Sequence, residues 1–297
     1  MNARQFIRLI RVPTLAATAV PLIIGGATAL AENIYGRIDS FSAPLWLDIL
    51  VVAFLIQIAT NMINEYGDYK HKIDTAPSPG YAGLIVSGET SAKEILLLAV
   101  LFYATAFGLG IILVIFRGVL LMLLGSISLI VGVLYSEGPL PISSTPFGEI
   151  FVGVVMGPIE VLSSNLAASG LVSNLALVFS IPVGFMVAAI LLTNNLRDLE
   201  KDHDHGRKTL AVIIGRRYGT LLLLVLMLLS FLWSIPAFII FSIPASVFLI
   251  WLAFPIALRS YFQITKKMHW PESVAIVSRL HMLIGVLLTL SILLLHF

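Results

Sequence analysis

The sequence predicts an all-α, polytopic membrane protein with nine transmembrane helices in one bundle. Of its 297 residues, 59% are hydrophobic and only 11% are charged, whereas a soluble domain carries about 25% charged residues. The mean hydropathy is +1.01, and a water-soluble fold could not bury that much apolar surface. The chain has no cysteine, which excludes disulfides, cysteine nucleophiles and cysteine metal ligands. We therefore expect a single transmembrane domain over residues 1–297.

The individual spans follow from the apolar runs, because a helix needs about 20 apolar residues to cross a bilayer. The first run, Val12–Ala31, carries no charge. The uncharged segment Leu221–Leu258 is long enough for two helices and divides near Ser242–Pro244. The remaining spans are expected at residues 45–64, 94–116, 118–136, 148–167, 171–196 and 274–296. Glu160 is expected at the outer end of the fifth span.

The distribution of basic residues supports this count and gives an orientation. With the N-terminus in the cytoplasm, the cytoplasmic segments are the N-terminus and the loops after the second, fourth, sixth and eighth spans. With Arg279, just inside the last span, they hold 16 of the 18 Lys and Arg residues, and the two exceptions are Arg37 and Arg117. An excess of Lys and Arg marks cytoplasmic loops. The sequence thus predicts a multi-pass protein of the cell membrane with a cytoplasmic N-terminus.

A cleaved secretory signal is the alternative for the first span. Arginines precede its apolar run, and Ala29-Leu30-Ala31 resembles a cleavage site. The run is longer than the usual core of a signal, however, and cleavage would leave eight spans. We therefore favour a retained first helix.

The first acidic segment, residues 64–74 (NEYGDYKHKID), directly follows the second predicted span. It holds three carboxylates at a helix end, where a membrane protein usually has few. On a helix, positions i, i+3, i+4 and i+7 share one face; here they are Asn61, Asn64, Glu65 and Asp68.

The second acidic segment, residues 194–212 (NNLRDLEKDHDHGRKTLAV), follows the sixth predicted span. Asn194, Asp198 and Asp202 are spaced by four and also share one face. Both segments contain Asn-x-x-x-Asp and lie on the predicted cytoplasmic side. Because the helices before them are four apart in order, the chain suggests two related four-helix units and one extra helix.

Solvated loop carboxylates paired with Lys and Arg are the simpler interpretation of such charge runs. A ligand site is favoured here because the acidic groups lie on one face at or just inside helix ends, where burial is costly. Carboxylate and amide oxygens suit a hard cation such as Mg²⁺, which proteins hold with one or two carboxylates plus substrate phosphates. Two facing segments would clamp a diphosphate through metal ions. Nearby cations would contact phosphate oxygens directly: Lys70, Lys72, Arg197, Arg207 and Lys208.

Two other metal sites are disfavoured. A calcium-binding loop beginning at Asp202 would need glycine at its sixth position and glutamate at its twelfth, but the chain has Arg207 and Ile213 there. His203 and His205 are two residues apart and would point away from each other on a helix, which argues against zinc.

Four stretches resemble the UbiA superfamily of intramembrane prenyltransferases. Residues 64–75 and 194–215 are similar to its first and second Asp-rich motifs, and residues 11–25 to its first helix. Residues 134–158 (LYSEGPLPISSTPFGEIFVGVVMGP) are similar to the segment of the branch that prenylates 1,4-dihydroxy-2-naphthoate in menaquinone biosynthesis. The likeness covers most of the chain.

This resemblance implies Mg²⁺-dependent transfer of a polyprenyl chain from its diphosphate to an aromatic acceptor at the cytoplasmic side of the bilayer. It implies no nucleic-acid partner. The implied metal ligands are Asn64, Glu65, Asp68, Asp74, Asn194, Asp198 and Asp202. The implied substrate-binding residues are Lys70, Lys72, Asn195, Arg197 and Lys208. The implied catalytic residues are Asp68, Asp198, Asp202 and Tyr135. The resemblance places Tyr135 near the reacting end of the prenyl chain.

Other functions remain open at this point. The acceptor is alternatively hydroxybenzoate, homogentisate or a glycerol-phosphate lipid, and Ser87 stands where the naphthoate branch often has a base. A transporter is disfavoured, because transporter sites lie near the midplane while these acids cluster at one face. Arg8 and Arg11 are most simply positive-inside anchors, although Arg11 lies within reach of the site.

Overall fold

The computed structural model describes residues 2–76, 80–266 and 270–295, and these residues contain helices but no β-strand. Nine helical segments among them are long and apolar enough to cross a membrane. The predicted number of spans is therefore confirmed. They are Val12–Ile34, Ala43–Lys70, Ala92–Arg117, Val119–Ser136, Gly148–Ser169, Asn174–Arg197, Leu210–Ile239, Ala245–Thr265 and Trp270–Leu293. The predicted end of the last span, residue 296, lies outside the described residues.

The first four spans are single helices: α2 (Val12–Ile34), α3 (Ala43–Lys70), α4 (Ala92–Arg117) and α5 (Val119–Ser136). The fifth combines α6 (Gly148–Val154), a π turn (Val155–Ile159) and α7 (Glu160–Ser169), and the sixth is α8 (Asn174–Arg197). The seventh joins α10 (Leu210–Leu232) to α11 (Ser234–Ile239), and the eighth joins a 3₁₀ helix (Ala245–Ala253) to α12 (Phe254–Thr265). The last contains α13 (Ser273–Leu293).

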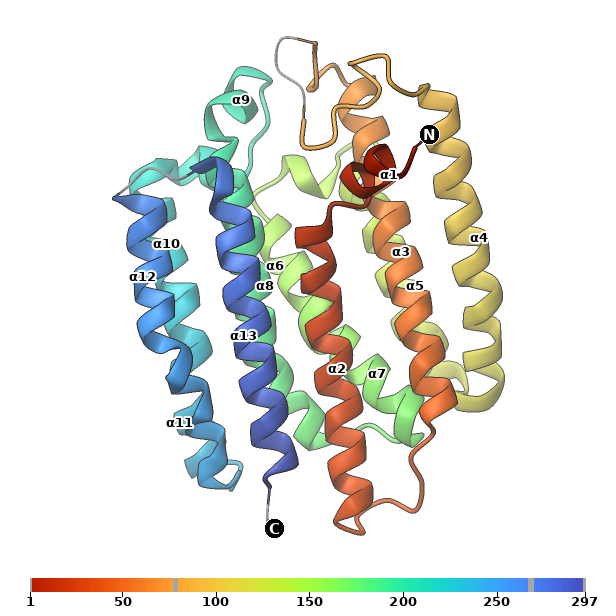
Figure 1. Cartoon of the computed structure of the whole chain (residues 1–297), viewed down its shortest axis with the longest axis vertical. Coiled ribbons are helices and arrows are strands. Elements are labelled where there is room, and N and C mark those ends of the chain that lie inside the picture. Colours follow the sequence, from red (N-terminus) through yellow and green to blue (C-terminus); the bar gives the residue numbers. More distant parts are fainter. Residues whose placement is uncertain (1, 77–79, 267–269, 296–297) are drawn as a thin grey trace.

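Two short α-helices lie outside the spans, both at the same end of the bundle (Figure 1). They are α1 (Ala3–Ile10) and α9 (Leu199–Asp204), and the loop between α3 and α4 lies at the same end. The last helix, α13, ends at the opposite end of the bundle, as an odd number of spans requires. The helix ends that carry the two acidic segments thus meet on one side.

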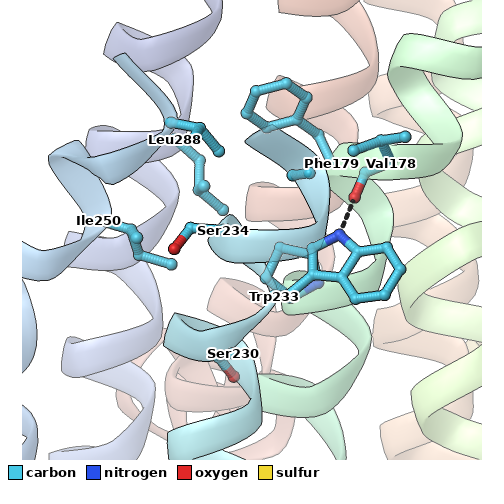
Figure 2. A pocket seen from close by; sticks show the side chains of 10 residues that line it. Val178, Phe179, Ser230, Trp233, Ser234, Ile250 and Leu288 are labelled. Carbon is cyan, nitrogen blue, oxygen red and sulfur yellow. Dashed lines mark hydrogen bonds between the residues drawn. The ribbon is translucent and has the colours of Figure 1, made fainter. Parts of the chain in front are cut away.

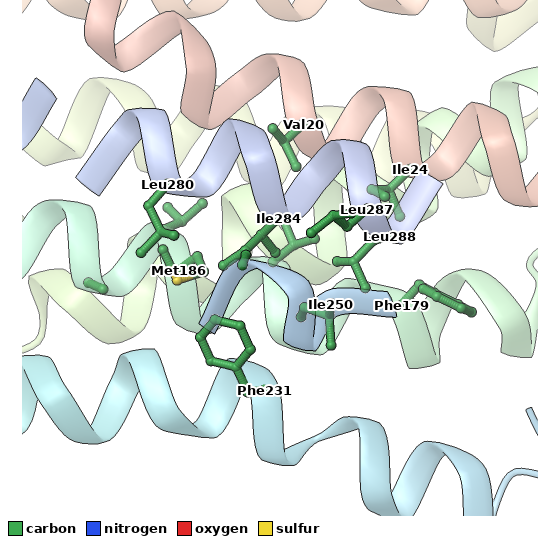
Figure 3. Packing of buried hydrophobic residues seen from close by; sticks show 14 of the residues in the cluster. Val20, Ile24, Phe179, Met186, Phe231, Ile250, Leu280, Ile284, Leu287 and Leu288 are labelled. Atoms are coloured by element: carbon green, nitrogen blue, oxygen red, sulfur yellow. The ribbon is translucent and has the colours of Figure 1, made fainter. Parts of the chain in front are cut away.

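The core of the bundle is formed by α2, α8 and α13, which are the most buried spans, whereas α3, α4 and α5 have few fully buried residues. Figure 3 shows Ile24 of α2, Met186 of α8 and Ile284 of α13 among the packed side chains, with Phe231 of α10 beside them. Close packing of these side chains gains dispersion energy. The exposed apolar surface of the outer helices suits a lipid surrounding.

A tryptophan repairs the break that a proline makes in α8. Pro182 has no N–H, so the carbonyl of Val178, four residues earlier, lacks its helical donor. Trp233 Nε1 donates to that carbonyl at 2.8 Å (Figure 2). Pro182 and Trp233 line a small cavity of about 10 Å³ between α8, α10, α11 and α13. A backbone group freed inside a bilayer must find such a partner.

The fifth span approaches α8 through glycines, one of which, Gly157, lies in the π turn. A Cβ on Gly157 would lie 2.5 Å from the Cα of Gly184, so neither position leaves room for a side chain. Glu160 begins α7 directly after the π turn. The span runs on to Ser169, so the expectation that Glu160 marks its outer end was wrong: the residue lies in the interior of the span.

Candidate active site

A cavity of about 680 Å³ lies at the end of the bundle that carries the acidic segments and extends between the spans. Apolar residues of several spans line its deeper part, among them Ala17 of α2, Ile56 of α3, Val131 of α5, Val187 of α8 and Val274 of α13. Polar and charged residues of both acidic segments line its other end. The cavity therefore joins a charged mouth to an apolar interior.

The first acidic segment contributes Asn64, Asp68 and Asp74 to the cavity wall. Asn64 accepts a hydrogen bond from Arg11 and donates through Nδ2 to Ser136 Oγ at 3.2 Å. The chain leaves α3 through a left-handed residue, Lys72, with φ +58°. This turn brings the backbone N–H of Asp74 to the carbonyl of Asp68, 3.1 Å away.

The second acidic segment contributes more residues, because α8 and α9 follow each other almost without interruption. Asn194, Asn195, Arg197, Asp198, Lys201, Asp202 and Arg207 all line the cavity. Arg197 Nη2 donates to Asn194 Oδ1 at 2.9 Å and to Asp198 Oδ2 at 2.6 Å. Asn195 Nδ2 donates to the buried carboxylate of Glu149 at 2.9 Å. The predicted face of residues spaced by four is thus present.

Arg207 connects the two segments. Its Nη2 lies 2.9 Å from Asp68 Oδ1 and its Nη1 lies 3.1 Å from Asp202 Oδ1. Lys201 makes a second connection, with Nζ 2.6 Å from Asp74 Oδ1. Burial raises the pKa of the Asp202 carboxyl, while the Arg207 guanidinium opposes that rise. Burial lowers the pKa of Arg207, but Asp68 and Asp202 outweigh it and raise the pKa above its usual value.

Tyr135 also lines the cavity, at the end of α5 and near the charged mouth. Tyr81, from the loop between α3 and α4, and Arg11, from the junction of α1 and α2, complete this end. The Arg11 guanidinium lies 5.9 Å from the centre of the Tyr81 ring. Cations and aromatic faces thus surround the carboxylates.

Four predicted site residues do not line the cavity. Glu65 is buried and accepts from the backbone N–H of Leu84 at 2.8 Å. Lys70 pairs with Glu137 at 3.0 Å on the outside. Lys72 and Lys208 are exposed. Their assignments as metal or phosphate ligands remain predictions, and this placement gives them no support.

Several cavity residues were absent from the predicted set: Arg11, Gln57, Asn61, Tyr81, Glu160 and Lys201. Lys201 follows Asp198 by three residues, and helical spacing would have placed it on the same face. Glu160 stands alone in an apolar run, and an ionisable residue there indicates function by default. Tyr81 gives no such signal, because only the folding of its loop brings it to the cavity.

The donor set fits a hard divalent cation. Asp68, Asp74, Asp198 and Asp202 supply carboxylate oxygens to one cavity, and Asn64 and Asn194 supply amide oxygens; Oδ2 of Asp74 is buried with no hydrogen-bond partner among the described residues. Within those residues, no three His, Asp or Glu side chains converge on one point. The arrangement suits Mg²⁺ held by one or two carboxylates with substrate phosphates completing the shell.

Comparison with known sequences agrees with the resemblance to the UbiA superfamily. A model of the UbiA prenyltransferase family matches residues 18–295. The 1,4-dihydroxy-2-naphthoate octaprenyltransferase of Bacillus subtilis is 34% identical over 293 residues, which are 98% of this chain and 92% of that protein. The protein of the same name from Escherichia coli is 29% identical over 236 residues, 75% of this chain and 74% of that protein.

Solved structures share the fold. A UbiA homologue from Aeropyrum pernix superposes with a TM-score of 0.69 at 18% identity and covers 93% of this chain and 96% of its own. A UbiA homologue from Archaeoglobus fulgidus, solved with GPP and Mg²⁺, gives a TM-score of 0.68 at 16% identity, covering 96% and 99% of the two chains. At these identities the likeness establishes the architecture alone.

Proposed function

The chain belongs to the UbiA prenyltransferase family, and from that premise we propose that it transfers a polyprenyl chain from its diphosphate to 1,4-dihydroxy-2-naphthoate in menaquinone biosynthesis. The family membership makes it a multi-pass membrane prenyltransferase. The naphthoate acceptor rests on the Bacillus subtilis relative, which aligns over almost the whole of both chains.

The observation that carries this proposal is the two-ended cavity. A prenyl diphosphate is an apolar chain with a highly charged head, and the cavity offers each part its own surroundings. Its charged mouth combines Asp68, Asp198 and Asp202 with Arg197 and Arg207. Its deeper walls come mainly from apolar residues of membrane-spanning helices.

The residues proposed to hold the metal are those that line the mouth: Asn64, Asp68, Asp74, Asn194, Asp198 and Asp202. Mg²⁺ bound there would neutralise the charge that develops on the leaving diphosphate. Arg197, Lys201 and Arg207 would contact the phosphate oxygens, after releasing the carboxylates they pair with in this structure. Donors aimed at the charge that develops in the transition state are usually the largest single source of catalysis.

The proposed reaction breaks the bond between the allylic carbon and the diphosphate oxygen, which keeps the electron pair. The acceptor ring then supplies the electrons for a new carbon–carbon bond, and the ring carbon releases its carboxylate as CO₂ in the naphthoate case or a proton in others. Tyr135, at the border of the charged and apolar parts, would face the developing positive charge with its ring. Enclosure of the cavity by helices would keep water from the allylic carbon.

We place the mouth of the cavity on the cytoplasmic side of the cell membrane. The loops that surround it hold most of the basic residues, which marks cytoplasmic segments. The N-terminal helix α1 lies at the same end (Figure 1).

The test is product analysis by mass spectrometry. Purified protein receives Mg²⁺, prenyl diphosphates of several lengths and a panel of acceptors: 1,4-dihydroxy-2-naphthoate, hydroxybenzoate, homogentisate and a glycerol-phosphate lipid. We expect diphosphate release and a prenylated, decarboxylated naphthoate product, both abolished by EDTA and restored by Mg²⁺. Faster prenylation of another acceptor would replace the naphthoate assignment, and metal-independent turnover would contradict the role of Mg²⁺.

A further inference from the structure

Glu160 is an acidic residue deep inside the membrane domain that the proposed chemistry does not use. Glu149, near the start of the fifth span, accepts a hydrogen bond from Asn195 and so lies at the depth of the second acidic segment. Glu160 lies 11 residues further along that span, which corresponds to about 16 Å at 1.5 Å per residue. Its carboxyl therefore lies far below the charged mouth, yet it lines the same cavity.

Glu160 lies on the cavity-facing side of the fifth span. Val152, Met156 and Glu160 all line the cavity and follow one another at intervals of four residues, a spacing that keeps side chains near one face of a helix. Glu160 directly follows the π turn at Val155–Ile159. π turns of this kind recur at functional sites.

The carboxyl is not satisfied by the protein. Its Oε2 is buried and has no hydrogen-bond partner among residues 2–76, 80–266 and 270–295. An ionisable side chain at this depth is expensive, and a missing partner adds the cost of an unmade hydrogen bond. Retention of such a group indicates a partner that comes from outside the chain.

Other polar side chains line the cavity on neighbouring spans. Gln57 lies on α3 three turns before Asp68, and its Oε1 accepts from Thr18 of α2 at 3.3 Å. Thr60 and Ser128 also line the cavity. The inner part of the cavity is thus a mixed surface with a few placed polar groups, the usual make-up of a site that orients a small molecule.

We propose that Glu160 marks a subsite for the aromatic acceptor and hydrogen-bonds a ring hydroxyl. This inference rests on the proposed function, in which two substrates enter the cavity. The prenyl chain has no group that can satisfy a carboxyl, and seating it there would leave the Glu160 carboxyl without a hydrogen bond. A hydroxylated aromatic ring donates that hydrogen bond and fits among apolar walls.

The side-chain directions support contact across the cavity. Helical side chains lean toward the N-terminus of their helix. The fifth span begins at the mouth, so Glu160 leans toward the mouth; α3 ends there, so Asp68 leans inward. The acceptor then lies between Glu160 and the diphosphate end of the donor, with its ring facing the allylic carbon.

The test separates the affinity for the acceptor from the affinity for the donor. We compare wild type, Glu160→Leu and Glu160→Gln, measuring KM for 1,4-dihydroxy-2-naphthoate and for the prenyl diphosphate at saturating co-substrate. Leucine removes the hydrogen bond and should raise the acceptor KM about tenfold while the donor KM stays unchanged. Glutamine keeps a hydrogen-bonding side chain and should raise the acceptor KM by less than about threefold.

Ser163→Ala is the matched control. Ser163 lies three residues further on α7, its hydroxyl is also buried without a hydrogen-bond partner among the described residues, and it does not line the cavity. It should leave both KM values unchanged. Thermal unfolding in detergent checks that each variant is folded, and Glu160→Gln keeps the test decisive if the leucine variant is unstable.

The outcomes separate the two proposals. An unchanged acceptor KM in Glu160→Leu overturns the subsite, and so does a change confined to the donor KM, to the preferred chain length or to kcat alone. Failure of the wild-type protein to prenylate any aromatic acceptor overturns the proposed function instead. That result is obtained without any Glu160 variant, so the two failures can be distinguished.

Discussion

The two acidic segments reach the same cavity by different means. In the second, α8 runs almost directly into α9, and Arg197 aligns Asn194 and Asp198 through contacts within four residues. In the first, α3 ends at Lys70, and the chain must turn at a left-handed residue before Asp74 reaches the cavity. Partners remote in sequence then hold the first segment in place; Arg11, for example, donates a hydrogen bond to Asn64. One half of the site is therefore built locally and the other by tertiary packing.

The largest expected effect tests whether the two segments are equal halves of one site. Asp68→Asn and Asp198→Asn each remove one carboxylate charge from the cavity while keeping the shape of the side chain. Loss of a group that stabilises developing charge costs about 10²–10³ in rate, so we expect each variant to lose at least about 100-fold in kcat. Radiolabelled prenyl transfer at saturating Mg²⁺ measures it. Full activity in either variant would remove that segment from the site.

The second prediction concerns Glu65, which shares the sequence pattern of the first segment but not its placement. Its Oε1 accepts from Leu84 N, and its Oε2 lies 3.6 Å from Arg11 Nη2. Glu65→Gln turns an amide N–H toward that arginine, and we expect a loss of about 1–3 kcal/mol in the free energy of unfolding. Thermal unfolding in detergent would detect it.

A magnesium titration of the same variant sharpens the comparison. Because Glu65 does not line the cavity, the Mg²⁺ concentration for half-maximal activity should match that of wild type. The conservative Asp68→Asn variant serves as the reference that should need more Mg²⁺. A rise for Glu65→Gln as large as that for Asp68→Asn would show that Glu65 holds metal after all.

The third prediction contrasts two lysines, one from each segment. Lys201 lines the cavity and pairs with Asp74, whereas Lys70 pairs with Glu137 outside it. Lys201→Met should raise the KM for the prenyl diphosphate about tenfold, the effect of losing one charge-assisted hydrogen bond. Lys70→Met should change that KM by less than about twofold, since surface pairs contribute little. Equal effects would mean that Lys70 reaches the phosphates during turnover.

The difference between the segments also explains what the sequence could predict. The number of spans follows from hydropathy alone, and the structure agrees with it. In the second segment a spacing of four places Asn194, Asp198 and Asp202 correctly, because one helical path carries all three. The same reasoning put Glu65 with Asn64 and Asp68, yet adjacent positions on a helix point 100° apart. Glu65 instead accepts a hydrogen bond from the backbone N–H of Leu84, away from the cavity.

Other cavity residues depend on packing that no local pattern encodes. Arg11 reaches Asn64 because α1 folds back over the end of the bundle. Gly157 of the fifth span closely approaches Gly184 of α8, and this contact joins residues distant in sequence. Composition and spacing thus predict the architecture and the local half of the site, while the tertiary half requires the structure.

The prediction with the smallest expected effect tests whether α1 stabilises the first acidic segment. Arg8 lies 2.8 Å from Glu89, and Ser87 Oγ donates to the same carboxylate at 3.0 Å. The hydrogen bond from Arg8 is the main cause that lowers the pKa of Glu89 in the folded protein.

A carboxyl whose pKa is lowered by folding stabilises the fold at any pH above its ordinary pKa of about 4.3. It loses this contribution as the pH falls through the pKa that it has in the folded protein. Glu89→Gln should therefore lower the Tm slightly near pH 7, and the difference from wild type should shrink toward zero below pH of about 4. Glu200 of the second segment pairs with Arg216 at 2.7 Å and provides the comparison: Glu200→Gln should give the same pH dependence in Tm. A Tm difference for Glu89→Gln that persists at low pH would assign the support to packing of α1 against the loop rather than to this ion pair.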